Sequence, residues 1–155
     1  MEINVLIDPE FKNLLLTGWL KKVIKATLAR EGMSGNIELG LFVSGQGKIR
    51  ELNQKYRNED EPTDVLAFAT EKEMGFLPFI EPPDGVRHLG EVTVSYPQAV
   101  IQAGEHHHSV EKEIAILTIH GVLHLLGYDH DEPENGKKMK AKEKEILEGL
   151  KGLVK

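Results

Sequence analysis

The stretch His-Gly-Val-Leu-His-Leu-Leu-Gly-Tyr-Asp-His, residues 120–130, places three histidines within one largely apolar run. His120 and His124 are four residues apart, so on an α-helix they share one face, with their Cβ atoms about 5–6 Å apart. Gly127 can adopt the left-handed conformation that ends a helix, which lets the chain turn and bring His130 to the same point. The pattern therefore predicts a metal ion held by His120, His124 and His130.

Three imidazole ligands leave one position open on a tetrahedral zinc ion, as in catalytic zinc sites and unlike structural sites closed by four ligands. A lone histidine on a helix is more often packed or exposed without a metal, and an isolated His-x-x-x-His pair also occurs by chance. The third histidine and the intervening Gly127 distinguish this stretch from such a pair. We therefore expect one zinc ion per chain.

The helix that carries His120 and His124 is expected to be central and buried. Residues 114–126 are apolar apart from Thr118 and these two histidines, and a helix that is apolar nearly all round belongs in a core. Ser109 is expected to cap its N-terminus. Two acidic residues, Glu111 and Glu113, then suit the positive end of the helix dipole.

A second group of histidines, residues 106–108, invites the same metal interpretation. Three consecutive residues cannot share one face of a helix, which weakens that interpretation. We interpret these residues as the end of a preceding helix and the loop that follows it.

The remaining elements indicate a single domain, residues 1–155, because this length suffices for one sizeable core. The expected strands are residues 3–7, 37–43, 63–69 and 89–96. The expected helices are residues 10–31, a helix capped by Ser44 and ending at Arg57, a short helix from about Pro97, the histidine helix, and residues 134–150. Residues 71–88, which contain several turn-forming glycines and prolines, are expected to form a long connection.

The amino-acid composition limits which residues can bind a metal and indicates where in the cell the protein is expected. The sequence has no cysteine, so a metal must be held by His, Asp or Glu, and a reducing cytosol suits the chain. The first ten residues lack the basic head and apolar stretch of a signal peptide, and no run approaches the roughly 18 apolar residues of a membrane span. We expect a soluble, cytoplasmic protein with no membrane partner.

The formal net charge of −6 conceals a segregation of charge along the chain. Residues 10–57 carry nine Lys and Arg against four Asp and Glu, residues 135–155 carry seven against three, and the segments between them are acidic. Basic patches at both ends of the chain suit phosphate groups, and the acidic centre suits a cation. The alternative is that these charges are simply solvated helix faces.

The spacing of the three histidines and Gly127 is shared with the metzincin zinc proteases, whose motif is His-Glu-x-x-His-x-x-Gly-x-x-His. Gly121 stands where these proteases have the glutamate that accepts a proton during peptide hydrolysis. Without that base the chain is a poor candidate for a metalloprotease.

A second resemblance covers more of the chain. Residues 120–130 resemble the signature of the YbeY family, bacterial ribosomal-RNA maturation factors regarded as metal-dependent single-strand endoribonucleases. Residues 52–68, with Leu-Asn-x-x-Tyr-Arg and Pro-Thr-Asp-Val-Leu-x-Phe, and residues 89–95 are similar to two further blocks of that family. Two departures are mild: Ala67 where the family often has serine, and Glu91 where it often has aspartate.

This resemblance implies an α+β fold, in which a small mixed four-stranded sheet packs on helices and the histidine helix carries a metzincin-like zinc site. It implies a zinc-dependent, single-strand-specific endoribonuclease that acts in 16S rRNA 3′-end maturation and in ribosome assembly and quality control. The implied partners are single-stranded rRNA and the ribosomal subunit or its proteins, and not DNA.

The resemblance also implies a functional arginine at Arg57. A guanidinium group offers a planar fork of donors that matches two phosphate oxygens, so Arg57 suits the scissile phosphate and the charge that develops on it. A surface salt bridge to Glu59 or Asp60 is the alternative role. Three carboxylates are candidates for orienting a ligand histidine or a water: Asp64, Asp129 and Asp131.

Two questions of function stay open at this point. The nucleophile that cleaves RNA is either a water or the 2′-hydroxyl of the RNA itself, because the motif contains no obvious base. The chain is alternatively a ribosome-assembly factor that binds RNA and ribosomal proteins and whose metal is structural.

Overall fold

Four strands form one mixed sheet in the computed structural model, which describes residues 1–57, 63–69, 85–128 and 132–153. In spatial order the strands are β1 (Glu2–Ile7), β2 (Ile37–Ser44), β4 (Arg87–Ser95) and β3 (Val65–Ala69). The first three run parallel, and β3 is antiparallel to β4 at one edge. The predicted α+β fold and its mixed four-stranded sheet are therefore confirmed.

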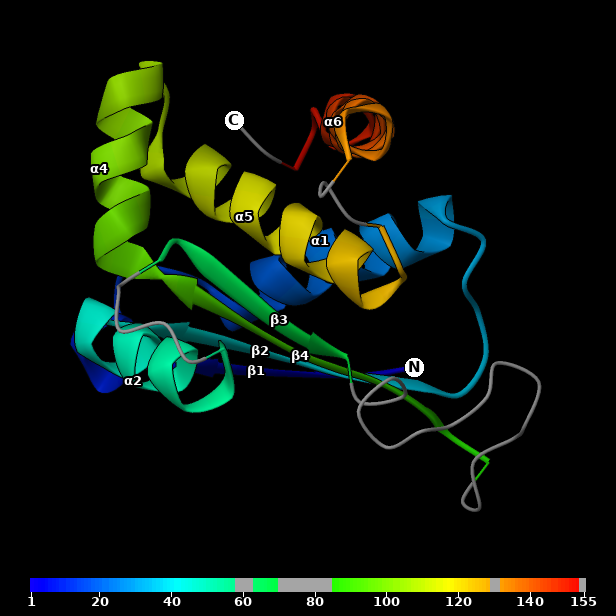
Figure 1. Cartoon of the computed structure of the whole chain (residues 1–155), viewed down its shortest axis with the longest axis horizontal. Coiled ribbons are helices and arrows are strands. Elements are labelled where there is room, and N and C mark those ends of the chain that lie inside the picture. The colour runs from blue at the N-terminus through cyan, green and yellow to red at the C-terminus, as the bar shows by residue number, and fades with distance from the viewer. Residues whose placement is uncertain (58–62, 70–84, 129–131, 154–155) are drawn as a thin grey trace.

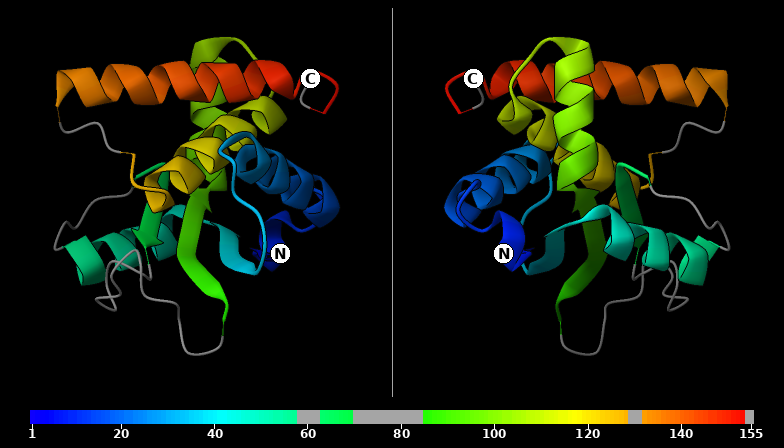
Figure 2. Two further views of the ribbon diagram at one scale, coloured as in Figure 1. Left: turned by 90° about the vertical axis from the view of Figure 1, so that its right-hand side faces the viewer. Right: turned by 90° about the vertical axis from the view of Figure 1, so that its left-hand side faces the viewer.

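The described helices lie mainly on one face of this sheet. They are α1 (Thr17–Arg30), α2 (Gln46–Arg57), α4 (Tyr96–His106), α5 (Val110–Leu125) and α6 (Pro133–Gly149). Figure 1 shows α5 lying across the sheet, with α1 next to it and α6 farther from the strands. In both views of Figure 2, α1 and α2 lie on opposite sides of the molecule. Among the strands, α1 packs on β1, at one edge of the sheet, and α2 packs on β3 and β4, at the other edge.

The first helix begins later than its apolar spacing predicted, at Thr17 instead of about residue 10. Residues Pro9–Phe11 form a separate 3-10 helix, where Asp8 accepts a hydrogen bond from the Glu10 backbone at 3.0 Å. Phe11 and Leu15 are both buried, so the apolar spacing continues through this turn and does not report its conformation. The predicted cap at Ser44 was also wrong, because Ser44 ends β2 and its hydroxyl donates to the Gly45 carbonyl.

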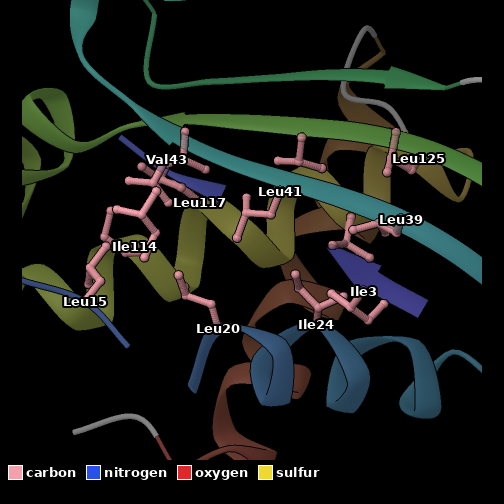
Figure 3. Packing of buried hydrophobic residues seen from close by; sticks show 14 of the residues in the cluster. Ile3, Leu15, Leu20, Ile24, Leu39, Leu41, Val43, Ile114, Leu117 and Leu125 are labelled. Atoms are coloured by element: carbon pink, nitrogen blue, oxygen red, sulfur yellow. The ribbon is translucent and has the colours of Figure 1, made fainter. Parts of the chain in front are cut away.

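The core lies between the sheet and the helices α1 and α5, as Figure 3 shows. Alternate residues of β2 are buried, and helical residues at spacings of three and four meet them. Strand side chains in this core include Ile3, Leu39, Leu41 and Val43, and helix side chains include Leu20, Ile24, Ile114 and Leu117. The sheet thus fixes one side of α5.

A second apolar cluster fixes the other side of α5. It joins α1, α5 and α6 through Val23, Ala115, Ile119, Leu123, Met139, Ile146 and Leu150. The prediction of a central, buried histidine helix is therefore confirmed. Part of the connection predicted at residues 71–88, and the loop at 58–62, lie outside the described residues. Within the described ranges, no helix is long and apolar enough to cross a membrane.

Candidate metal centre

The helix α5 begins and ends where the sequence predicted. Ser109 accepts a hydrogen bond from the Lys112 backbone at 3.1 Å and so caps the N-terminus. At the other end Gly127 has a φ of 104°, and its amide donates to the His124 carbonyl at 3.0 Å. This turn directs the chain away from the helix immediately after the two histidines.

The imidazoles of His120 and His124 converge on one point. Their Nε2 atoms lie 3.1 Å apart, and their rings meet edge to face with centroids 4.6 Å apart. Two nitrogens at the usual zinc distance and tetrahedral angle lie about 3.3–3.4 Å apart, so this pair fits one zinc ion with little movement. His130 lies outside the described residues, and its part in the site stays a prediction.

A carboxylate that the sequence analysis missed contacts the other nitrogen of His120. Glu143 of α6 is in hydrogen-bond contact with His120 Nδ1 through Oε1, and both side chains are mostly buried. A carboxylate on Nδ1 holds the proton there and leaves Nε2 as the electron-pair donor, an arrangement common behind metal-bound histidines. The signal was present, since Glu143 interrupts the inward stripe of Met139 and Ile146 at helical spacing.

Replacing Glu143 by glutamine should weaken zinc binding by roughly 10- to 100-fold, because the imidazole of His120 loses its orienting and polarising partner. Competition against a coloured chelator measures this affinity. Glu145→Gln is the matched control, because Glu145 lies on the same helix but its described contact is with Lys142. Equal zinc affinities for the two variants would contradict the role of Glu143.

Gly121, at the position of the metzincin glutamate, faces the sheet. A Cβ atom at this position would lie closer to Val92 Cγ1 than real Cβ atoms approach, 3.1 Å from Val92 Cγ2 and 3.3 Å from Val65 Cγ2. Both valines are β-branched and stand on strands, so they have few ways to move aside. A protease-type glutamate therefore does not fit on this helix while it packs on β3 and β4.

Gly121→Ala should accordingly lower the free energy of unfolding, because overpacking costs roughly 1–3 kcal/mol and exceeds the gain of about 0.5–1 kcal/mol in helix propensity. Gly104→Ala is the control, since Gly104 is also helical and nothing lies within 4 Å of an added Cβ. Denaturant unfolding should show opposite signs for the two variants. A stabilised Gly121→Ala would mean that α5 has more room above the sheet than described.

The other predicted site residues are only partly described. The backbone of Arg57 ends α2, and its side chain lies outside the description, as do Glu59 and Asp60. Asp64 accepts a hydrogen bond from the Thr63 hydroxyl at 3.4 Å, and its carbonyl accepts one from the Ser95 amide at 2.9 Å.

Asp129 and Asp131 also lie outside the described residues. The roles proposed for Arg57, Asp64 and these two aspartates therefore stay predictions.

Two charged residues, Glu31 and Lys142, lie beside Tyr128 in the segment that follows α5. Tyr128 donates a hydrogen bond to Glu31, which together with burial raises the pKa of its phenol above the ordinary value. Lys142 lies 3.4 Å from the same carboxylate, which raises the pKa of its ammonium group. These contacts join α1 and α6 to the end of the histidine helix.

A hollow of about 290 Å³ opens beside that segment. Its lining is apolar, aromatic and basic: Leu126, Gly127, Tyr128, Asn135 and Lys138. This mixture suits a ligand with both a flat ring and a negative charge.

The histidines at 106–108, which precede the other end of α5, also lie as predicted, at a helix end and its following turn, yet two of them take part in a second group. His106, His108 and Glu113 offer ligand atoms that all lie within 4.8 Å of one another and could hold a metal. Sequence reasoning missed this group because it assigned Glu113 only to the helix dipole.

Comparison with known proteins gives consistent matches over most of the chain. A family model described as Endoribonuclease YbeY matches residues 6–151. A protein of that name from Dehalococcoides mccartyi is 52% identical over 137 residues, which cover 85% of this chain and 86% of that protein. One from a Roseiflexus species is 38% identical over 149 residues, covering 96% and 92%. The solution structure of TM1509 from Thermotoga maritima matches with a TM-score of 0.63 at 33% identity, covering 97% of this chain and 89% of that one.

Proposed function

The chain belongs to the YbeY endoribonuclease family, whose members are hydrolases, and from this premise we propose that it is a zinc-dependent endoribonuclease specific for single-stranded RNA. Its residues 1–155 act as one catalytic domain. Its substrate is rRNA in the cytoplasm, where it acts in maturation of the 16S 3′ end and in ribosome assembly and quality control. Its partners are accordingly single-stranded rRNA and the ribosomal subunit or its proteins.

One observation carries the zinc assignment. The Nε2 atoms of His120 and His124 meet at 3.1 Å, and Glu143 contacts Nδ1 of His120 from behind. With His130 as third ligand, a bound zinc ion would supply a Lewis acid and an activated water at neutral pH. Glu143 keeps the His120 ring in the orientation and tautomer that this role requires.

Arg57 is the residue proposed to hold the scissile phosphate. Its guanidinium is charged at every physiological pH and offers two parallel donors to two phosphate oxygens. As the phosphorus is attacked and the bond to the leaving oxygen breaks, negative charge grows on those oxygens, and Arg57 stabilises it. Because Gly121 leaves no room for a side chain, this position of α5 supplies no base.

The hollow beside Tyr128 supports a single-stranded substrate. An unstacked base can lie on an aromatic ring, and a duplex does not offer its bases in this way. Tyr128 provides the ring and Lys138 a positive charge for the backbone, both lining the same hollow. This hollow follows directly on the helix end that carries His124.

The ends of the RNA products test the activity and identify the nucleophile. A single-stranded oligonucleotide and its duplex should be incubated with zinc-loaded protein, and we expect cleavage of the single strand only. A 2′,3′-cyclic phosphate product indicates attack by the RNA 2′-hydroxyl, and a 5′-phosphate or 3′-phosphate indicates water. If the zinc-loaded protein cleaved no RNA, the proposed endoribonuclease activity would be contradicted, and a role as an RNA-binding assembly factor would be favoured.

RNA affinity should fall as the salt concentration rises, because we propose that the basic side chains of α2, the helix that ends at Arg57, bind phosphates of the RNA. Three to five phosphate contacts on a single strand predict a slope of about −2 to −3.5 in log affinity against log salt. Replacing the exposed Lys48 and Arg50 by alanine should flatten this slope by about one unit. Fluorescence anisotropy across a salt series measures it.

Lys21→Ala/Lys22→Ala is the matched control, since both lysines are exposed on α1, on the opposite side of the molecule. This variant should keep the slope of the original protein. The reverse result, a flattened slope only in the α1 variant, would mean that RNA approaches over α1 and that the charges of α2 are merely solvated.

A further inference from the structure

The corner between α4 and α5 gathers three metal-binding side chains outside the His120 centre. α4 ends at His106, and His107 takes a left-handed conformation with a φ of 56°. The amide of His108 then donates to the Ala103 carbonyl at 3.1 Å, and the next residue, Ser109, is the N-cap of α5. Two helix caps in succession therefore fix the backbone of this corner.

Glu113 is the centre of the group. Its side chain is only 1% exposed, and a carboxylate buried to this degree needs partners that offset its lost hydration. His106 Nδ1 lies 2.9 Å from Oε1, and His108 Nε2 lies 3.5 Å from Oε2. Within the described part of the chain, His108 Nε2 is shielded from solvent and makes no hydrogen bond.

We propose that His106, His108 and Glu113 bind a second divalent transition-metal ion of the zinc class. Two imidazole nitrogens and one carboxylate oxygen suit Zn²⁺, Co²⁺ or Ni²⁺, whereas Mg²⁺ and Ca²⁺ prefer oxygen ligands throughout. Ligand atoms about 2.0–2.2 Å from one ion lie roughly 3–4 Å apart. The distances of 2.9 Å from His106 Nδ1 to Oε1 and 3.5 Å from His108 Nε2 to Oε2 of Glu113 fall close to this range, each to a different oxygen of the carboxylate. All three atoms lie within 4.8 Å, so a small rotation closes the set.

His106 can make that rotation, because its side chain is 56% exposed and its described side-chain contacts are with the two other members of the group, Glu113 at 2.9 Å and the His108 ring at 5.5 Å between centroids. His108 and Glu113 are enclosed, so they form the fixed part of the site. The ion gives a ligand bond to His108 Nε2, which among the described residues lies 3.5 Å from Glu113 Oε2 but makes no hydrogen bond. It also places a positive charge beside the buried carboxylate, whereas a neutral imidazole offers that carboxylate only a hydrogen bond.

The bound ion would tie the end of α4 to the first turn of α5. Glu113 lies seven residues before His120, about 10 Å along the helix, so this ion and the zinc at the other end are separate. Its effect is structural: it anchors the N-terminal end of the helix whose C-terminal half carries His120 and His124.

Metal counting on protein without a histidine tag tests the proposal. Protein dialysed against micromolar zinc should contain two equivalents, and His120→Ala/His124→Ala/His130→Ala should retain one. Adding His106→Ala to that variant should remove the second equivalent. Because His106 is exposed, its replacement does not threaten folding, and circular dichroism verifies that the helices remain.

His107→Asn is the matched control, since asparagine tolerates the left-handed conformation and His107 is not part of the ligand group. It should leave both equivalents in place. Glu113→Gln keeps the shape of the side chain and should lose one equivalent.

Two results would overturn the proposal. In one, the protein lacking the three later histidines holds no zinc, so that the corner is only a hydrogen-bonded ion pair. In the other, its remaining equivalent survives both His106→Ala and Glu113→Gln, so that the ion lies elsewhere.

Discussion

Zinc at the His120 centre is expected to be lost when any one of His120, His124 or His130 is replaced by alanine. In a His106→Ala background, which isolates this centre, the zinc content should fall from about one equivalent to below about 0.1 for the triple variant. The reason is geometric: two imidazoles from one helix and a third from the returning chain share one ion. Elemental analysis after dialysis measures the content.

His88→Ala is the control for removing a histidine as such. His88 lies on β4 and contacts Glu38 at 3.0 Å, so this variant should keep its zinc. A triple variant that still held a full equivalent in the His106→Ala background would show that zinc binds elsewhere. A normal zinc content in the single variant His130→Ala would show that only the assignment of His130 as the third ligand is wrong.

Arg57→Ala is expected to lower the rate of RNA cleavage by about 10²–10³-fold while zinc content and folding stay unchanged. A donor pair aimed at the phosphate acts mostly in the transition state, so the loss should appear in kcat more than in KM. Single-turnover cleavage of a labelled oligonucleotide separates the two effects.

Arg57→Lys serves as the conservative comparison, since it keeps the charge and removes the planar fork. It should recover only part of the lost rate. If Arg57→Ala unfolded or lost its zinc, the arginine would be architectural. Full activity in Arg57→Ala would remove it from the catalytic residues.

Much of this fold was predictable because local pattern and tertiary packing agree. β1 and β2 alternate more and less buried residues, and α5 is apolar on nearly every side because the sheet and the helices α1 and α6 enclose it. Both ends of α5 could be predicted from Ser109 and Gly127, because an N-cap side chain and a glycine in the left-handed conformation act on the adjacent backbone only. The start of α1 failed for the opposite reason: Phe11 and Leu15 are buried by the tertiary structure through a turn that apolar spacing does not distinguish from a helix.

The candidate site was predictable only where its residues are close in sequence. His120 and His124 meet because one helix fixes them four residues apart. The contact of Glu143 with His120 spans 23 residues and depends on how α6 crosses α5, which no local pattern states. The approach of His106 and His108 to Glu113 depends on a left-handed residue at His107, an uncommon conformation for a non-glycine residue.

We propose that zinc held by His120, His124 and His130 makes this chain an endoribonuclease. The most direct test of this proposal is cleavage of single-stranded RNA by one protein preparation before chelation, after chelation, and after the return of one equivalent of zinc, with His124→Ala treated in parallel. We predict cleavage that disappears with the metal and returns with zinc in the original protein, and no cleavage at any stage in His124→Ala. Equal cleavage with and without metal, or by His124→Ala, would contradict the account.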